Sequence, residues 1–224
     1  MKRSFREYIL RLLLLFAGLV IAHLGVTLFL LTNLGADPFN VFIQGIFRTL
    51  GRTIPVLTHG YTHAAVSILI MLILLVTDKS YVKTGTLVCM VAGGPIIDVF
   101  THLLETFIHP GNPFVIRLLT LALGCVILAF GMTIVIKSDA GTGPNDLVAV
   151  VISDRLSKPF GPVRILVDIG FTGTGFLMGG AVGIGTLISA FLVGPVAGIF
   201  LPRSEKLVNA LLHIQKDQPV SHTD

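Results

Sequence analysis

The chain carries one hydrophobic unit twice. Residues 11–38 and 117–144, which lie 106 positions apart, are identical at eleven of their 28 aligned positions. Both copies end in a glycine–proline segment, which reads GADPFN from Gly35 and GTGPND from Gly141. Duplication of a hydrophobic unit is typical of secondary transporters, which are built from internal repeats. The chain is therefore expected to fold as two related halves.

A shorter match extends the repeat toward the end of each half. Residues 85–100 and 185–200 share a GTL segment and, further on, a GP segment. We therefore predict a first repeat in residues 1–110 and a second repeat in residues 111–205. The remaining residues, 206–224, are predicted to form a short polar cytoplasmic tail.

The composition identifies a membrane protein. Apolar residues make up 53% of the chain and charged residues 12%, about half the roughly 25% of a soluble domain. A helix of about 20 apolar residues crosses a hydrocarbon core roughly 30 Å thick. The uncharged run 169–202 is too long for one such helix, so a turn is expected at Gly179-Gly180. The six predicted spans lie near residues 12–31, 57–77, 84–104, 118–136, 162–179 and 183–201.

Two further segments are too short to cross the membrane comfortably. Residues 38–50 and 144–156 reach only about 20 Å each as helices. If both are re-entrant or interfacial, each half crosses three times and the second half is inserted upside down. If both cross, the chain has eight spans and parallel halves. We favour the first interpretation: an all-α polytopic membrane protein with six transmembrane helices as two inverted three-helix repeats, each with a short broken or re-entrant helix after its first span.

The basic residues predict the orientation, because Lys and Arg concentrate on cytoplasmic loops. With six spans and an internal N-terminus, thirteen basic residues fall inside and only Arg48, Arg52 and Arg117 outside. Eight spans give the same division. We expect a multi-pass protein of the bacterial cytoplasmic (inner) membrane with both termini cytoplasmic. Anionic lipid accounts for the net charge of +4, so membrane lipid is an expected partner and nucleic acid is not.

The two breaks supply most of the candidate substrate-binding residues. Glycine permits backbone conformations that other residues avoid, and proline fixes the start of a helix. The free amides at such a start can face an anion or a dipole. Asp and Asn are also favoured N-caps, so capping is the simpler role for them. The candidates are Gly35, Asp37, Pro38, Asn40, Asp98, Gly141, Gly143, Pro144, Asn145 and Asp146.

Asp98 is the candidate that lies outside the breaks. An isolated charge inside a span costs roughly 2.5–3.5 kcal/mol, so we expect Asp98 to face the bundle interior. It either carries a proton or substrate, or it lies near the interface, where it pairs locally or caps a helix broken at Gly94-Pro95. The second repeat has Gly198 at the corresponding position and therefore no matching acid.

Three histidines lie in apolar surroundings. His23 is expected to be an interior hydrogen-bonded histidine, with a proton relay as the alternative. His59 and His63 stand one helical turn apart, but no acidic or cysteine partner lies nearby in the sequence. We therefore expect no metal site and no cofactor.

Regularly spaced glycines predict close helix packing. Gly18 and Gly25 stand seven residues apart and recur in the second repeat, while Gly194 and Gly198 stand four apart. Such spacing places small residues on one helix face, where neighbouring backbones can approach.

The break segments resemble those of a family of small bacterial integral membrane proteins, the YczE/YyaS/YitT-like family. The resemblance rests on LTNLGADPFNVFIQGI, KSDAGTGPNDLVAVVIS and VGIGTLISAFLVGP, and it covers residues 8–203. It implies a multi-spanning cytoplasmic-membrane protein that is either a transporter or an accessory to biosynthetic loci. It implies no particular substrate and no binding residues. Asp37 stands where the second copy has Gly143, so the two breaks need not act alike.

The predicted function is that of a secondary transporter for a small polar or anionic metabolite. The alternative is a non-transporting accessory protein that supports a biosynthetic or partner membrane complex. The substrate-binding subunit of an energised importer is a third option, against which the repeat argues. An enzyme is not expected, because no cluster of histidines or carboxylates brings reactive groups together. The oligomeric state stays open, and a homo-oligomer is compatible with the sequence.

Overall fold

The computed structural model describes residues 4–77, 79, 82–158 and 160–212, which form eight α-helices and no strand. The all-α prediction is therefore confirmed for the described residues. The helices are α1 (Phe5–Thr32), α2 (Pro38–Leu50), α3 (His59–Thr77), α4 (Thr84–Leu104), α5 (Phe114–Ser138), α6 (Pro144–Leu156), α7 (Phe160–Leu177) and α8 (Ile184–Leu211).

Five of these helices, α1, α3, α4, α5 and α8, are long and apolar enough to cross a membrane. They match five of the six predicted spans. The sixth predicted span corresponds to α7, whose apolar stretch Ile165–Leu177 is shorter. The expected turn between α7 and α8 is present, and Gly179 adopts a φ of 88°, which other residues rarely adopt.

α8 continues to Leu211, past the predicted end of the span at residue 201. Two contacts with the last turns of α5 hold this extension. Ser204 Oγ lies 2.7 Å from Thr133 Oγ1, and Lys137 Nζ donates to Glu205 Oε2 at 2.8 Å. The first residues of the predicted tail, up to Leu211, are thus helical, whereas 213–224 lie outside the described residues.

α1 and α5 run antiparallel along their whole length. Arg11 Nη1 donates to the carbonyl oxygen of Ser138 at 2.9 Å, and Arg117 Nε donates to that of Thr32 at 2.8 Å. The two bonds are equivalent in the repeat. Arg117 is the counterpart of Arg11 and Ser138 is the counterpart of Thr32, because each pair lies 106 residues apart. We name the two ends of the bundle after these carbonyls, the Thr32 end and the Ser138 end.

Glycines allow the two helices to approach this closely. A Cβ on Gly18 would lie 2.9 Å from the carbonyl oxygen of Gly131, and a Cβ on Gly124 would lie 3.0 Å from that of Gly25. Real Cβ atoms rarely approach a backbone so closely, so larger residues would force α1 and α5 apart. These four glycines form the α1–α5 seam, and the predicted close packing is confirmed there.

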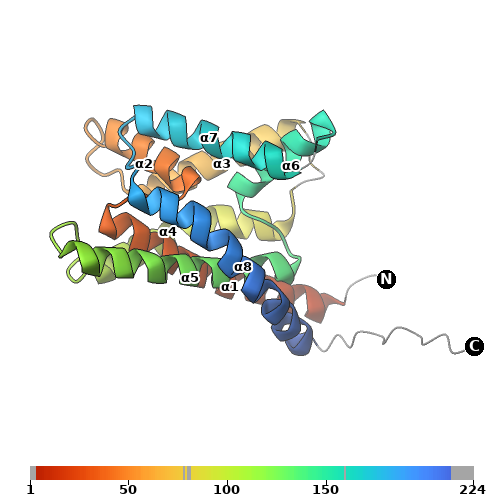
Figure 1. The fold of residues 1–224 in the computed structure, drawn as a ribbon. Helices are drawn as coiled ribbons and strands as arrows, with labels where there is room; N and C mark the ends of the chain where they lie inside the picture. Colours follow the sequence, from red (N-terminus) through yellow and green to blue (C-terminus); the bar gives the residue numbers. More distant parts are fainter. Residues whose placement is uncertain (1–3, 78, 80–81, 159, 213–224) are drawn as a thin grey trace, which may run out of the picture.

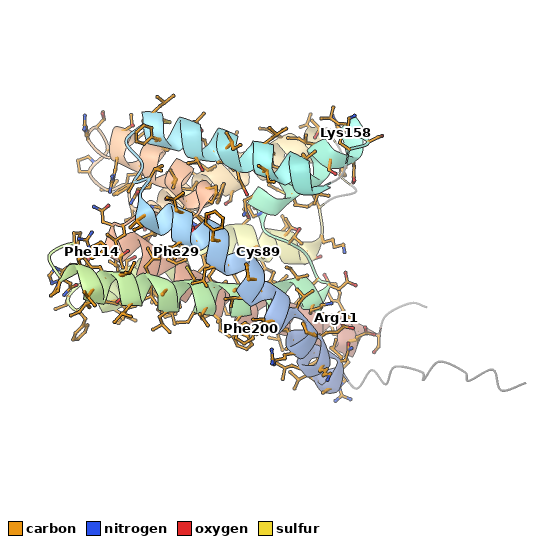
Figure 2. The ribbon with its side chains drawn as sticks, in the orientation of Figure 1. Arg11, Phe29, Cys89, Phe114, Lys158 and Phe200 are labelled. Atoms are coloured by element: carbon orange, nitrogen blue, oxygen red, sulfur yellow. The ribbon has the colours of Figure 1, made fainter. Side chains whose placement is uncertain are left out.

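The helices form two layers (Figure 1). One layer contains the seam helices with α4 along α1 and α8 along α5, and the other contains α2, α3, α6 and α7. Figure 2 shows Phe114 at the Thr32 end and Arg11 at the Ser138 end, with Phe29 and Cys89 between them. Phe29 and Cys89 are both almost fully buried, so the core lies between the ends and along the seam.

The short helices α2 and α6 each finish at the same end of the bundle as the helix before them. For α2 this is the Thr32 end, and for α6 it is the Ser138 end. In α2, Arg48 Nη2 donates to Asn33 Oδ1 at 2.7 Å, directly beyond the last turn of α1. In α6, Arg155 Nη2 donates to the carbonyl oxygen of Thr77 at 3.0 Å, where α3 ends. Neither helix therefore runs from one end of the bundle to the other.

The two halves differ where their third and fourth helices meet. α3 packs along α4, and the carbonyl oxygen of Gly60 lies directly against Gly94. Among the described residues of the second half, α7 and α8 have few close contacts, because α7 packs on α2 and α6 instead. A Cβ on Gly194 or Gly198 would meet nothing within 4 Å. The predicted packing at these two glycines is therefore wrong.

We expect Gly25→Val to destabilise the protein much more than Gly198→Val. The valine at position 25 would collide with the backbone of Leu128, whereas position 198 is open. Overpacking typically costs about 1–3 kcal/mol, which is about 2–4 °C of melting temperature per kcal/mol at this chain length. Cys89 and Cys125 are buried free thiols, so a thiol-reactive fluorogenic dye reports unfolding. Equal melting temperatures for the two variants would contradict the seam.

Candidate functional site

The first break is capped by its own side chains. Gly35 adopts a φ of 123°, which turns the chain away from the end of α1. Asp37 is the N-cap of α2 and Pro38 its first residue. Asp37 Oδ1 accepts from the backbone amide of Asn40 at 3.3 Å, and Asp37 Oδ2 accepts from Asn40 Nδ2 at 2.7 Å. The carboxylate therefore occupies the partly positive start of α2.

The second break has no such cap. The N-cap of α6 is Gly143, which has no side chain, and Pro144 follows as the first helical residue. Gly141 lies against the backbone of Gly85, so it fits only as glycine. Asn145 is half-buried in the first turn of α6, and the side chain of Asp146 lies outside the described part of the chain.

Each break is held by the fourth helix of the opposite half. The backbone amide of Gly185, at the start of α8, donates to the carbonyl oxygen of Leu34 at 2.8 Å. The amide of Gly85, at the start of α4, donates to the carbonyl oxygen of Ala140 at 3.0 Å. These four residues are again repeat counterparts, so the two halves exchange equivalent backbone bonds.

Asp98 holds the first turn of α3. Its Oδ2 accepts from Thr58 Oγ1 and its Oδ1 from the backbone amide of Gly60 at 2.9 Å. α4 runs without interruption through Pro95, so the expected helix break at this point is wrong. The carboxylate therefore binds a neighbouring helix start rather than its own.

His59 connects the first break to α3. Its Nε2 lies 3.2 Å from Asn40 Oδ1, and Asn40 Nδ2 is already committed to Asp37. Because an amide oxygen only accepts, His59 Nε2 is the donor, and Asp37, Asn40 and His59 form one hydrogen-bonded chain. Asp37 and Asn40 thus connect to the start of α3, and Asp98 binds the same helix start.

The structure extends the His59–His63 pair into a row of polar residues along α3, because Ser67, which the sequence interpretation missed, lies one turn further on. His59, His63 and Ser67 stand four residues apart, so they share one helix face. His63 packs edge-on against His23 of α1, with ring centroids 5.6 Å apart, and against Phe39 of α2 at 5.4 Å. The four-residue spacing of polar groups in an otherwise apolar span was the signal that could have found this row.

The candidate residues of the two breaks form separate groups. The group around Asp37 and Asn40 meets the first turns of α3, and the group around Gly141 meets the start of α4. Towards the Ser138 end, the space between α3 and α6 is filled by the apolar cluster of Leu74, Leu147 and Val151. The structure therefore does not bring all ten candidates around one pocket.

A hollow of ≈ 570 Å³ opens at the Thr32 end. It lies between the last turns of α1 and α2 and the segment that follows α4, and no candidate residue lines it. Its polar lining residues are Asn33, Gln44, Arg48, Glu105, Thr106 and His109. Among the described residues, no group of three or more His, Cys, Asp or Glu side chains is arranged to hold a metal ion.

The chain matches, over residues 9–202, the family of unknown function called DUF6198. It belongs to this family. The match includes both breaks and most of both predicted repeats.

Curated relatives cover most of the chain. It is 27% identical to the uncharacterized membrane protein YczE of Bacillus subtilis over 205 residues, and this alignment covers 91% of each chain. It is 24% identical to the uncharacterized protein YyaS of the same organism, over 84% of this chain and 91% of YyaS. An uncharacterized protein of Haemophilus influenzae is 30% identical, over 84% of this chain and 82% of its own. No solved structure matches the chain. The resemblance to YczE and YyaS is confirmed, as is the membrane character of the protein.

We expect Asp98→Ala to lower the stability of this family member by about 1–3 kcal/mol, because the Thr58 hydroxyl and the Gly60 amide lose their acceptor. Asp98→Asn keeps one acceptor oxygen and should lose less. Glu105→Gln, at an exposed position one residue after α4, serves as the control. Thermal unfolding of the three variants measures the difference. An unchanged melting temperature for Asp98→Ala would contradict the role of Asp98 at the start of α3.

Proposed function

We propose that the protein is a secondary transporter for a small polar or anionic metabolite, built from two inverted halves with six membrane crossings, and that it performs no catalytic chemistry. The observation that carries the proposal is the antiparallel α1–α5 pair with its reciprocal arginine bonds. Repeat counterparts that face each other in antiparallel helices are expected of inverted repeats, whereas parallel repeats would align them side by side.

The two short helices support the same proposal. Each returns to the end it came from, so the helix starts at Pro38 and Pro144 lie within the bundle. Non-helical backbone at membrane depth survives only where protein buries it or where it lines a wet cavity. Transporters use such half-helix starts to bind substrates.

The starts differ in the ligand that each would favour. At α2 the carboxylate of Asp37 already neutralises the helix start and would repel an anion. At α6 the N-cap is Gly143, which has no side chain, so the N-cap position itself carries no charge; the acid of this first turn, Asp146, stands three residues further on. We therefore assign the anionic or polar group of the substrate to the start of α6.

The difference between the halves supports a transport cycle. α3 is closed against α4, while α7 stands away from α8. In an inverted pair, exchanging these two conformations between the halves would turn access from one end to the other. The hollow at the Thr32 end and the apolar cluster at the Ser138 end suit one such end state.

The charges support an orientation with both termini in the cytoplasm of a bacterial cell. Arg48 and Arg117 lie at the Thr32 end, whereas Arg11, Lys137 and Arg155 lie at the Ser138 end. The positive-inside rule then places the Ser138 end in the cytoplasm. Membrane lipid would cover the exposed apolar faces, and these faces also leave room for a homo-oligomer.

We expect reconstituted protein to carry at least one member of a panel of ¹³C-labelled carboxylates and uncharged polar metabolites into liposomes. Mass spectrometry of the liposome contents measures the uptake. Gly143→Asp places a carboxylate at the N-cap of α6, as Asp37 does at α2, so it should lower anion uptake about fivefold. It should not lower the melting temperature, because Asp is a favoured N-cap. Gly111→Asp, which adds the same charge in an exposed turn, should leave uptake unchanged.

Uptake that survives Gly143→Asp, Pro38→Ala and Pro144→Ala would remove the breaks from the mechanism. Absence of uptake for the whole panel, together with a membrane partner that copurifies in stoichiometric amount, would favour the accessory role instead.

A further inference from the structure

The interior of the first half contains two polar atoms that no described group satisfies. His63 Nδ1 and Ser67 Oγ are buried and have no hydrogen-bond partner, and they lie one turn apart on α3. Buried polar groups in proteins are nearly always paired, so two adjacent exceptions point to a ligand or an ion.

Four helices meet at His63. His23 of α1 and Phe39 of α2 pack edge-on against its ring. Gly93 of α4 closes the site, because a Cβ there would lie 2.8 Å from His23 Nε2 and 3.0 Å from His63 Cε1. A larger residue at this position would have to displace the imidazole rings.

The hydrogen bonds fix the form of the neighbouring histidine. His23 Nδ1 lies 2.9 Å from the carbonyl oxygen of Leu19, which can only accept. In neutral His23 the proton is therefore on Nδ1, and the lone pair on Nε2 faces Gly93 and the ring of His63. The lone pair of His23 Nε2 thus lies beside the ring of His63, whose Nδ1 has no hydrogen-bond partner.

We propose that the His63–His23 pair binds the proton that drives transport, with His63 as the residue that takes it up. The inference rests on the transport function proposed above. One proton adds to the lone pair of His63 Nδ1 and gives an imidazolium of charge +1, and the same proton leaves when the site opens to the other side. Uptake with a singly charged anion makes the load neutral, which avoids the cost of moving a net charge through the bilayer.

The packing links this proton to the conformation of the helices. In the described arrangement, a charged His63 would have no acceptor for its new N–H, and a buried unpaired charge is strongly unfavourable. Protonation therefore favours a state in which α3 has moved away from α1 and α2 and water reaches the ring. A ligand that binds one state better shifts the population towards it, and here the ligand is the proton.

The charged and titratable groups around the site are few. His23 on α1 and His59 on α3 would repel a charge on His63, and Asp98 on α4 is committed to the start of α3. On α2, Asp37 is joined to Asn40, and Arg48 donates to Asn33 and Gly179 at the Thr32 end. Arg155 of α6 donates to Thr77 at the far end of α3, and Asp168 lies on α7, outside the pair. His63 Nδ1 itself has no hydrogen-bond partner.

A titration of the imidazole rings tests the proposal without a substrate. Protein with ¹⁵N-labelled histidine is placed in lipid nanodiscs, and solid-state NMR spectra are recorded from pH 8 to pH 4.5. His63→Phe keeps an aromatic ring of similar size and removes both nitrogens, so it assigns the signals of residue 63. His102→Phe, at an exposed position, is the matched control.

We expect the signals of His63 to change from the neutral to the protonated form within this range, and those of His23 to shift with the same midpoint. In His63→Phe the shift of His23 at that midpoint should be lost, whereas His102→Phe should leave both changes intact. A His63 ring that stays neutral down to pH 4.5 would overturn the proposal. If the protein takes up a metabolite although His63 stays neutral, the proton site is wrong and the proposed transport function is unaffected. If His63 is protonated but no metabolite is taken up, the proton site is supported and the transport function is contradicted.

Discussion

The close antiparallel contact between α1 and α5 is the constraint on which the rest of the structure depends. Four glycines bring the two backbones together, and an arginine at each end binds the last carbonyl of the other helix. Such contacts replace the hydrophobic effect, which is weak between helices in lipid. Because the partners are repeat counterparts, this one interface sets the relation between the two halves.

From this relation follows the placement of the breaks. α8 starts against the first break and α4 against the second, through the bonds of Gly185 and Gly85. The short helices then fold back toward their own ends, and α3 carries His59, His63 and Ser67 through the space beside them. The polar row on α3 therefore lies beside the first break, to which His59 is bonded through Asn40.

The sequence predicted the parts of the fold that depend on composition and local chemistry. Apolar length located five spans, and the uncharged run with Gly179 located the turn before α8. Capping chemistry anticipated Asp37 at the start of α2. Partners that are distant in the chain were not predictable: Asp98 binds the start of α3, and His59 binds Asn40. The open face at Gly194 was also missed, because spacing shows which residues share a face but not which helix covers it.

The antiparallel contact can be measured directly by cross-linking in membranes. In a background with Cys89→Ser and Cys125→Ser, cysteines are paired as Arg11→Cys with Ser138→Cys, and as Thr32→Cys with Arg117→Cys. A short bismaleimide should cross-link both pairs within one chain, because each joins positions that are bonded in the structure. It should not cross-link Arg11→Cys with Arg117→Cys, which lie at opposite ends. Efficient cross-linking of that last pair within one chain, and failure of the first two, would place the halves parallel and contradict the account.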